Sequence, residues 1–183
     1  MFGLLDLSPQ LIEWKEIKSI GKVLTGSTPK TNIGTYWNGD IKWIAPAEIS
    51  SDAFYVTDTE RKITVEGKAS CSLDLIKQGT VLLSSRAPIG KVAIAGTDMY
   101  CNQGFKNIEC SPQLNNIFLY FILKNNSEYL NSLGRGATFK EISRGIVESI
   151  RIPVPPIELQ KQFSDFVKQV DKSKFILKHD KLQ

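Results

Sequence analysis

Short apolar stretches alternate with polar, glycine-bearing stretches along the chain as far as residue 155. The apolar stretches are four or five residues long and rich in β-branched and aromatic side chains, which favours β-strands. Successive stretches follow one another too closely for helices to alternate with them. We therefore expect an α+β fold with a curled, mostly antiparallel sheet, whose strands lie at residues 41–44, 53–57, 61–65, 80–84 and 91–95.

One helix is expected within this β-rich part, beginning after Asn115. Large apolar side chains then recur at helical spacing, and Gly134 supplies a common helix stop. The side chains that set the spacing are Phe118, Phe121, Ile122, Tyr129, Leu130 and Leu133. The pattern predicts one long helix packed against the sheet.

The chain divides at residues 152–156, which read Ile-Pro-Val-Pro-Pro. Proline cannot donate a backbone hydrogen bond, and the residue before it is disfavoured in the α conformation. This segment is therefore predicted to be a stiff, extended joint, with Pro156 in the first turn of a helix that runs to Gln183. The division gives a β-rich domain at residues 1–152 and a helix at residues 153–183.

The terminal helix carries one narrow apolar stripe with polar residues elsewhere. A stripe with steps of four, three, four and seven residues is typical of a coiled-coil seam and needs a partner helix to cover it. The alternative is that the stripe packs on the chain's own domain, because short heptad runs are ambiguous. The predicted interface residues are Leu159, Phe163, Phe166, Val170 and Leu177.

Composition and charge are typical of a soluble globular domain, with 42% hydrophobic and 23% charged residues. The net charge of +4 permits nucleic-acid binding without requiring it. No apolar run approaches the ~20 residues of a membrane helix, and the first residues do not resemble a signal peptide. We expect a cytoplasmic protein with no membrane partner.

The sequence offers little for catalysis or metal binding. Its three cysteines, Cys71, Cys101 and Cys110, show no zinc-type spacing, and its one histidine, His179, lies far from them. We expect reduced, partly buried thiols, no metal site and no catalytic residues. An alternative is a metal-dependent nuclease, because Asp52 precedes Glu60 and Lys62 at a nuclease-like spacing; such spacings also arise by chance on a solvated strand.

Four polar loops stand out between the apolar strands, at residues 26–31, 82–92, 101–106 and 134–144. Each combines hydroxyls, amides or cations with glycines that bring backbone N–H groups to the surface. Phosphate contacts and base-edge hydrogen bonds use these groups. Ordinary turns use the same residue types, so composition alone leaves both interpretations open.

The order of these segments and their amino-acid sequences resemble those of the target recognition domains of type I restriction specificity subunits. The resembling segments are a Gly-Ser-Thr-Pro loop leading to Gly-Asp-Ile-Lys-Trp-Ile at residues 26–44, Leu-Leu-Ser-Ser-Arg to Lys-Val-Ala at 82–93, Asn-Gln-Gly-Phe at 102–105, and Ile-Pro-Val-Pro-Pro to Gln at 152–160. The similarity is distributed in order over residues 14–178.

This resemblance implies a non-catalytic DNA-binding chain that reads one half of a bipartite double-stranded DNA site. Partner subunits would supply the chemistry, with S-adenosylmethionine, ATP and Mg²⁺ as their cofactors; this chain would need none. It would dock the methyltransferase subunit and meet the restriction subunit through the complex. Residues 1–152 would be the target recognition domain, and residues 153–183 the conserved spacer and dimerisation helix.

The residues expected to contact DNA come from the four loops. Arginine suits guanine and glutamine suits adenine in bidentate pairs, so Arg86 and Gln103 are the candidates for bases. The lysines are expected to neutralise phosphates. The full candidate set is Thr28, Lys30, Ser84, Ser85, Arg86, Lys91, Gln103, Lys106, Arg135, Lys140 and Arg144.

A family subunit normally carries two recognition domains and two conserved helices, whereas this chain carries one of each. We expect either a half-subunit or a fragment, and a two-fold homodimer through residues 157–182. A second interpretation is a half-subunit that binds only the methyltransferase subunit and no DNA.

Overall fold

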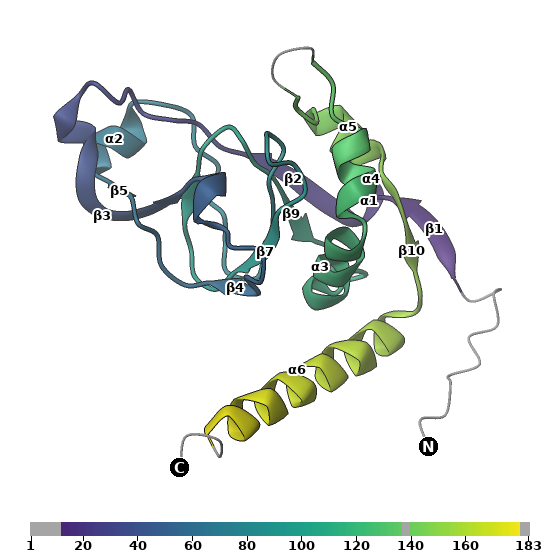
Figure 1. The fold of residues 1–183 in the computed structure, drawn as a ribbon. Helices are drawn as coiled ribbons and strands as arrows, with labels where there is room; N and C mark the ends of the chain where they lie inside the picture. Colours follow the sequence, from purple (N-terminus) through teal and green to yellow (C-terminus); the bar gives the residue numbers. More distant parts are fainter. Residues whose placement is uncertain (1–11, 137–139, 180–183) are drawn as a thin grey trace.

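The computed structural model describes residues 12–136 and 140–179, with side chains as far as residue 170. The predicted α+β class is confirmed, with mixed sheets and short helices (Figure 1). In chain order the elements are β1 (Glu13–Glu16), α1 (Ile17–Ile20), β2 (Gly21–Thr25), η2 (Gly34–Tyr36), β3 (Trp37–Ile44), η3 (Pro46–Glu48), β4 (Tyr55–Val56), β5 (Lys62–Ile63), α2 (Val65–Ala69), β6 (Val81–Leu83), β7 (Val92–Ala95), β8 (Tyr100–Cys101), β9 (Lys106–Cys110), α3 (Asn116–Asn125), α4 (Ser127–Ser132), α5 (Arg144–Ser149), β10 (Arg151–Val154) and α6 (Ile157–His179).

The described strands form three sheets where one was expected. The largest has the order β2-β9-β6-β7-β4, a second has the order β5-β3-β8, and β1 pairs with β10. Most strand pairs are antiparallel, while β4–β7 and β3–β8 are parallel. All five expected strands overlap a strand of the structure; β3 begins four residues earlier than expected, and β4 and β5 are two residues long.

The central strands of the large sheet are buried on both faces. Alternate residues of β6 point to opposite sides, so Val81 and Leu83 join one apolar cluster while Leu82 joins another. Helices α1, α3 and α5 contribute to the first cluster. Burial on both faces explains why these strands read as continuous apolar runs rather than as alternating ones.

The single helix expected over residues 116–133 is two helices, α3 and α4. Asn115 begins α3 as expected, because its Oδ1 accepts hydrogen bonds from the backbone N–H groups of Ile117 and Phe118 at 2.9 and 3.1 Å. Asn126 then leaves the helical conformation, with φ −113° and ψ 27°. The apolar spacing continues across the break, which is why the pattern did not reveal it.

Helix α6 begins at Ile157 and extends away from the domain (Figure 1). Its first turns are attached to α3 by a buried polar contact. The side chain of Gln160 accepts a hydrogen bond from the backbone of Asn115 at 2.8 Å and donates to the carbonyls of Gln113 and Pro155 at 3.1 and 2.8 Å. Ser164, one turn later, donates to Oδ1 of Asn115 at 2.6 Å.

Part of the predicted seam packs on the chain itself. The ring of Phe163 meets the rings of Phe118 and Phe121 edge-on, with centroids 5.9 and 5.4 Å apart. Phe166 and Val170 remain 48% and 37% exposed. Helix α6 therefore packs on the domain at its beginning, and the residues that the structure describes show no coiled coil. The side chain of Leu177 lies outside the described residues.

The joint at residues 152–156 is extended as expected, but its first three residues belong to a sheet. Strand β10 pairs with β1, and Pro153 lies opposite Trp14. A two-stranded sheet has an open edge on each strand, which lets it accommodate a proline. Within the described residues, no helix is long and apolar enough to cross a membrane.

Candidate nucleic-acid interface

The four polar loops meet at one place, although they are far apart in the sequence. The backbone N–H of Ser27 donates to the carbonyl of Cys101 at 3.0 Å, and that of Ser85 donates to the carbonyl of Gly104 at 2.8 Å. The N–H of Ile142 in turn donates to the carbonyl of Ser85 at 2.9 Å. Backbone hydrogen bonds therefore join the third loop to the first and to the second, and the fourth loop to the second.

Gly26 permits the closest of these approaches. A Cβ atom at this position would lie 1.9 Å from the carbonyl oxygen of Cys101. Any side chain would push the first loop away from the third, so the glycine is required by packing rather than by a turn.

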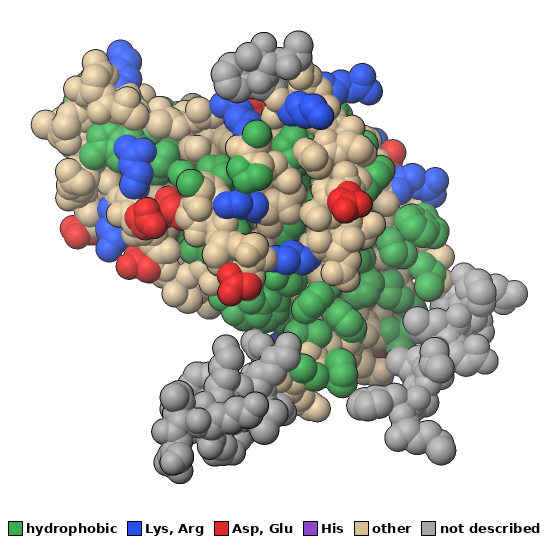
Figure 2. Space-filling view, in the orientation of Figure 1, with side chains coloured by type: hydrophobic (Ala, Val, Ile, Leu, Met, Phe, Trp, Pro, Cys, Tyr) green, Lys and Arg blue, Asp and Glu red, His purple; other side chains and the backbone are tan. Residues whose placement is uncertain are grey.

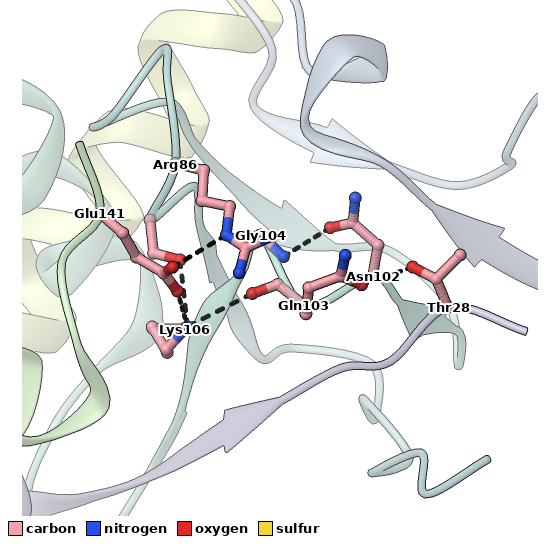
Figure 3. A network of polar contacts seen from close by, with 8 residues as sticks. Thr28, Arg86, Asn102, Gln103, Gly104, Lys106 and Glu141 are labelled. Atoms are coloured by element: carbon pink, nitrogen blue, oxygen red, sulfur yellow. Dashed lines mark hydrogen bonds and ion pairs between the residues drawn. The ribbon is translucent and has the colours of Figure 1, made fainter. Parts of the chain in front are cut away.

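An ion-pair network joins the second, third and fourth loops (Figure 3). Nζ of Lys106 lies 3.1 Å from Oε1 of Glu141, and also donates to Oγ of Ser85 at 3.2 Å and to the carbonyl of Gln103 at 3.3 Å. Oε2 of Glu141 accepts from Nε of Arg86 at 2.9 Å. Partial burial acts to raise the pKa of Glu141, but the hydrogen bonds from Lys106 and Arg86 outweigh it and hold the pKa below its ordinary value.

Gln103 connects this network to the first loop. Its side chain is exposed, and its Oε1 accepts a hydrogen bond from Oγ1 of Thr28 at 2.5 Å. The neighbouring Asn102 uses its Oδ1 to accept from the backbone N–H of Gly104 at 2.8 Å, which closes the turn. Figure 3 shows Arg86, Gln103 and Thr28 side by side across this site.

Three residues expected to contact DNA directly are buried, and this expectation is corrected. Ser84 and Ser85 have no exposed surface, and Lys106 is 7% exposed. Ser84 donates to the carbonyl of Pro88 at 2.7 Å and accepts from the backbone N–H of Lys91 at 2.8 Å. Contacts between the loops cover these side chains. Their hydrogen bonds therefore hold the loops together.

The remaining candidates lie at or near the surface. Lys91 is half-buried and reaches the carbonyl of Pro46 at 3.2 Å, while Arg144 pairs with Glu148 at 2.7 Å. Lys30, Arg135 and Lys140 are exposed, and Thr28 is half-buried. Residues 137–139 of the fourth loop lie outside the described residues.

Basic and hydrophobic side chains gather on different parts of the face shown in Figure 2. In Figure 2, several Lys and Arg side chains gather at the end of the molecule that carries α5. Hydrophobic side chains gather instead where α3 meets the beginning of α6. The two surfaces are separate.

Glu141 is the residue of this site that sequence reasoning missed. It lies inside the fourth loop, but a search for groups that bind an anionic polymer passes over a carboxylate. Its position directly after Lys140, in a loop with several cations, was the available signal. Only the fold brings it against Arg86 and Lys106, respectively 55 and 35 residues earlier in the chain.

The residues of the alternative nuclease site have other contacts. Asp52 accepts from the hydroxyl of Ser50 at 2.8 Å, and Lys62 lies 3.7 Å from Asp58. Among the described residues, no group of three or more His, Cys, Asp or Glu could hold a metal ion. The cysteines are free thiols, and burial raises the pKa of Cys101 to about 12.

Comparison with known proteins gives the family. The profile of the type I restriction modification DNA specificity domain matches residues 9–183. The chain belongs to this family.

Two curated relatives of this specificity domain illustrate the similarity. The type I restriction enzyme MjaIX specificity subunit of Methanocaldococcus jannaschii is 41% identical over 160 residues, which are 86% of this chain and 37% of that protein. The EcoR124I/EcoR124II specificity subunit of Escherichia coli is 27% identical over 175 residues, 92% of this chain and 43% of that protein. The chain thus spans about two fifths of the length of these relatives.

Solved structures share the fold of the specificity domain. A chain from a structure of a type I restriction–modification system matches with a TM-score of 0.73 at 21% identity, covering 98% of this chain and 43% of that one. The HsdS subunit from Thermoanaerobacter tengcongensis matches with a TM-score of 0.70 at 19% identity, covering 98% of this chain and 42% of that one.

Proposed function

We propose that this specificity domain recognises one half of a bipartite double-stranded DNA site within a type I restriction–modification complex. The observation that carries the proposal is the convergence of four loops on one exposed site that holds Arg86 and Gln103 (Figure 3). These two side chains offer the bidentate groups that suit guanine and adenine in the major groove.

The exposed cations around this site would bind the DNA backbone. Lys30, Arg135, Lys140 and Arg144 would neutralise phosphates and position the domain without selecting a sequence. Thr28 and Lys91 would support or extend these contacts from the edge of the site. Ser84, Ser85 and Lys106 would act only by holding the loops.

Helix α6 would provide the contacts with protein partners. Its exposed Phe166 and Val170 continue the apolar stripe beyond the part that packs on α3. A second copy of the helix would cover this stripe and give a homodimer, as in a two-stranded coiled coil. The same helix would contribute to the docking surface of the methyltransferase subunit, and the restriction subunit would join through the complex.

The chain would catalyse nothing in this arrangement. Methyl transfer and DNA cleavage would take place in the partner subunits, which bind S-adenosylmethionine, ATP and Mg²⁺. This chain would decide where on the DNA they act.

Mapping of methylated bases tests the proposal. The methyltransferase subunit is expressed with this chain in a host that lacks other adenine and cytosine methylation, and modified positions are read genome-wide. A defined split motif is expected. Absence of any motif, with a stable complex of the two proteins, contradicts sequence recognition and favours a chain that binds only the methyltransferase.

A further inference from the structure

Among the contacts of the described residues, the side chain of Arg86 is held through its Nε. It comes from the turn between β6 and β7, and its Nε donates to Oε2 of Glu141 at 2.9 Å. The backbones of the two residues also form an isolated β-bridge, as do those of Arg135 and Glu141. Among the described residues, no partner engages Nη1 or Nη2 of Arg86. A long, flexible side chain is thus fixed in direction while its paired donors stay available.

Glu141 is itself fixed at both oxygens. Its Oε1 lies 3.1 Å from Nζ of Lys106, whose side chain is 8% exposed. A buried ammonium without a counter-charge is costly, so Lys106 requires this carboxylate. Lys106 is in turn held by Oγ of Ser85 and the carbonyl of Gln103. The carboxylate therefore cannot swing away from Arg86 without leaving Lys106 unpaired.

This arrangement favours a base contact over a phosphate contact for Arg86. A phosphate contact depends on net positive charge, and a carboxylate at hydrogen-bonding distance offsets that charge. A bidentate contact to O6 and N7 of guanine depends on the direction of two N–H groups, which the carboxylate improves. Gln103 shows the same feature, because Thr28 holds its Oε1 while its Nε2 has no partner among the described residues.

We infer that Glu141 is a positioning residue for sequence recognition: held by buried Lys106, it directs Arg86 towards one guanine of the DNA site. The inference rests on the proposed function and deepens it. It assigns a role in specificity to two residues, Glu141 and Lys106, that do not touch the DNA bases.

Selection from a random duplex DNA library tests the inference, because it reveals the preferred base at every position of the bound site. The purified full chain is compared with its Glu141→Gln and Arg86→Lys variants at low salt, and bound sequences are read. We expect the original chain to enrich a short motif containing a guanine. Both variants should lose the preference for guanine at the same single position, by on the order of tenfold, while the other positions stay unchanged.

The matched control is Glu148→Gln. Glu148 also pairs with an arginine, Arg144, at 2.7 Å on the exposed surface of α5. Its replacement removes the same charge from the same end of the molecule and should leave the motif unaltered. Thermal unfolding of every variant distinguishes a change in the direction of the Arg86 side chain from a loss of folding.

The outcomes are distinguishable. If Glu141→Gln alters all positions equally, or tightens binding to every sequence with the motif unchanged, Glu141 acts on stability or charge alone and the inference is wrong. If Glu141→Gln does not fold, Glu141→Asp keeps the charge beside Lys106 while shortening the reach to Arg86, and the same single-position loss is expected. If the original chain enriches no motif at all, the proposed function itself fails.

Discussion

Burial separates residues of similar chemistry within a single loop. Ser84 and Ser85 are fully buried, while the side chain of the next residue, Arg86, is 47% exposed. Hydroxyls in such a loop either satisfy the backbone of the protein or face a ligand, and their type alone does not distinguish the two. At the scale of the residue, contacts between loops decide the role.

Gly26→Ala should separate the first loop from the third. The added Cβ would meet the backbone of Cys101, which cannot move aside as a side chain can. We expect a loss of about 1–3 kcal/mol in the free energy of unfolding, measured by urea denaturation. Gly34→Ala is the control, because nothing lies within 4 Å of its Cβ position, and it should change stability by less than ~0.5 kcal/mol. Equal effects of the two variants would contradict this reason for Gly26.

Glu141→Gln should lower stability in a way that depends on pH. The folded state holds the pKa of Glu141 below its ordinary value of 4.5, so the stabilisation by this carboxylate is present above that pH. It is lost as the pH falls through the lower folded pKa, because the carboxyl then becomes neutral like the amide. Urea denaturation at neutral pH and at acid pH should show the difference between original and variant shrinking. A difference that persists unchanged in acid would contradict the ion-pair explanation.

At the scale of the element, α6 carries two apolar surfaces on one helix. Its first turns pack on α3 through Phe163 and through the buried Gln160, while Phe166 and Val170 face outward. The heptad pattern in the sequence merges these two surfaces. The structure also shows that a buried glutamine, which a hydrophobic pattern ignores, fixes the direction in which the helix leaves the domain.

Gln160→Ala should loosen this attachment. The change leaves the backbone N–H of Asn115 and the carbonyls of Gln113 and Pro155 without their side-chain partner. Unsatisfied buried groups of this kind cost about 1–3 kcal/mol, which urea denaturation should detect. The control is Gln162→Ala on the exposed side of the same helix, where a change of less than ~0.5 kcal/mol is expected. Similar losses in both variants would show that the helix is insensitive to the buried contact.

At the scale of the whole molecule, the polar loops around Arg86 and the apolar patch where α3 meets the beginning of α6 lie on separate parts of the surface (Figure 2). The first surface is polar and basic, as expected for DNA. The second is apolar and continues along α6 (Figure 1), where Phe166 and Val170 are exposed. In the proposed function, DNA and a second helix would therefore occupy different surfaces of the chain.

Light scattering should detect a homodimer at high protein concentration. Val170→Glu places a charge in the exposed stripe and should shift the chain towards a monomer, because a buried unpaired charge is strongly disfavoured. Gln162→Glu introduces the same charge on a part of the helix outside the predicted stripe and should leave the dimer intact. A monomer of the original chain at high concentration would contradict dimerisation through α6.

Sequence by itself determined the class of fold, the strands β3, β6 and β7, the beginning of α3 and the helical end of the chain. These features are local, since β-branched runs, an asparagine cap and a proline joint act on their own neighbours. It also indicated which loops could form the site, because the polar loops are the same segments that resemble the family.

Tertiary structure alone decided how those loops work. It divided the strands among three sheets, broke the expected helix at Asn126 and buried Ser84, Ser85 and Lys106. It also brought Glu141 to Arg86 from 55 residues away and Thr28 to Gln103 from 75. The physical reason is that burial and ion pairing depend on neighbours in space, and no local pattern records which distant loop will supply them.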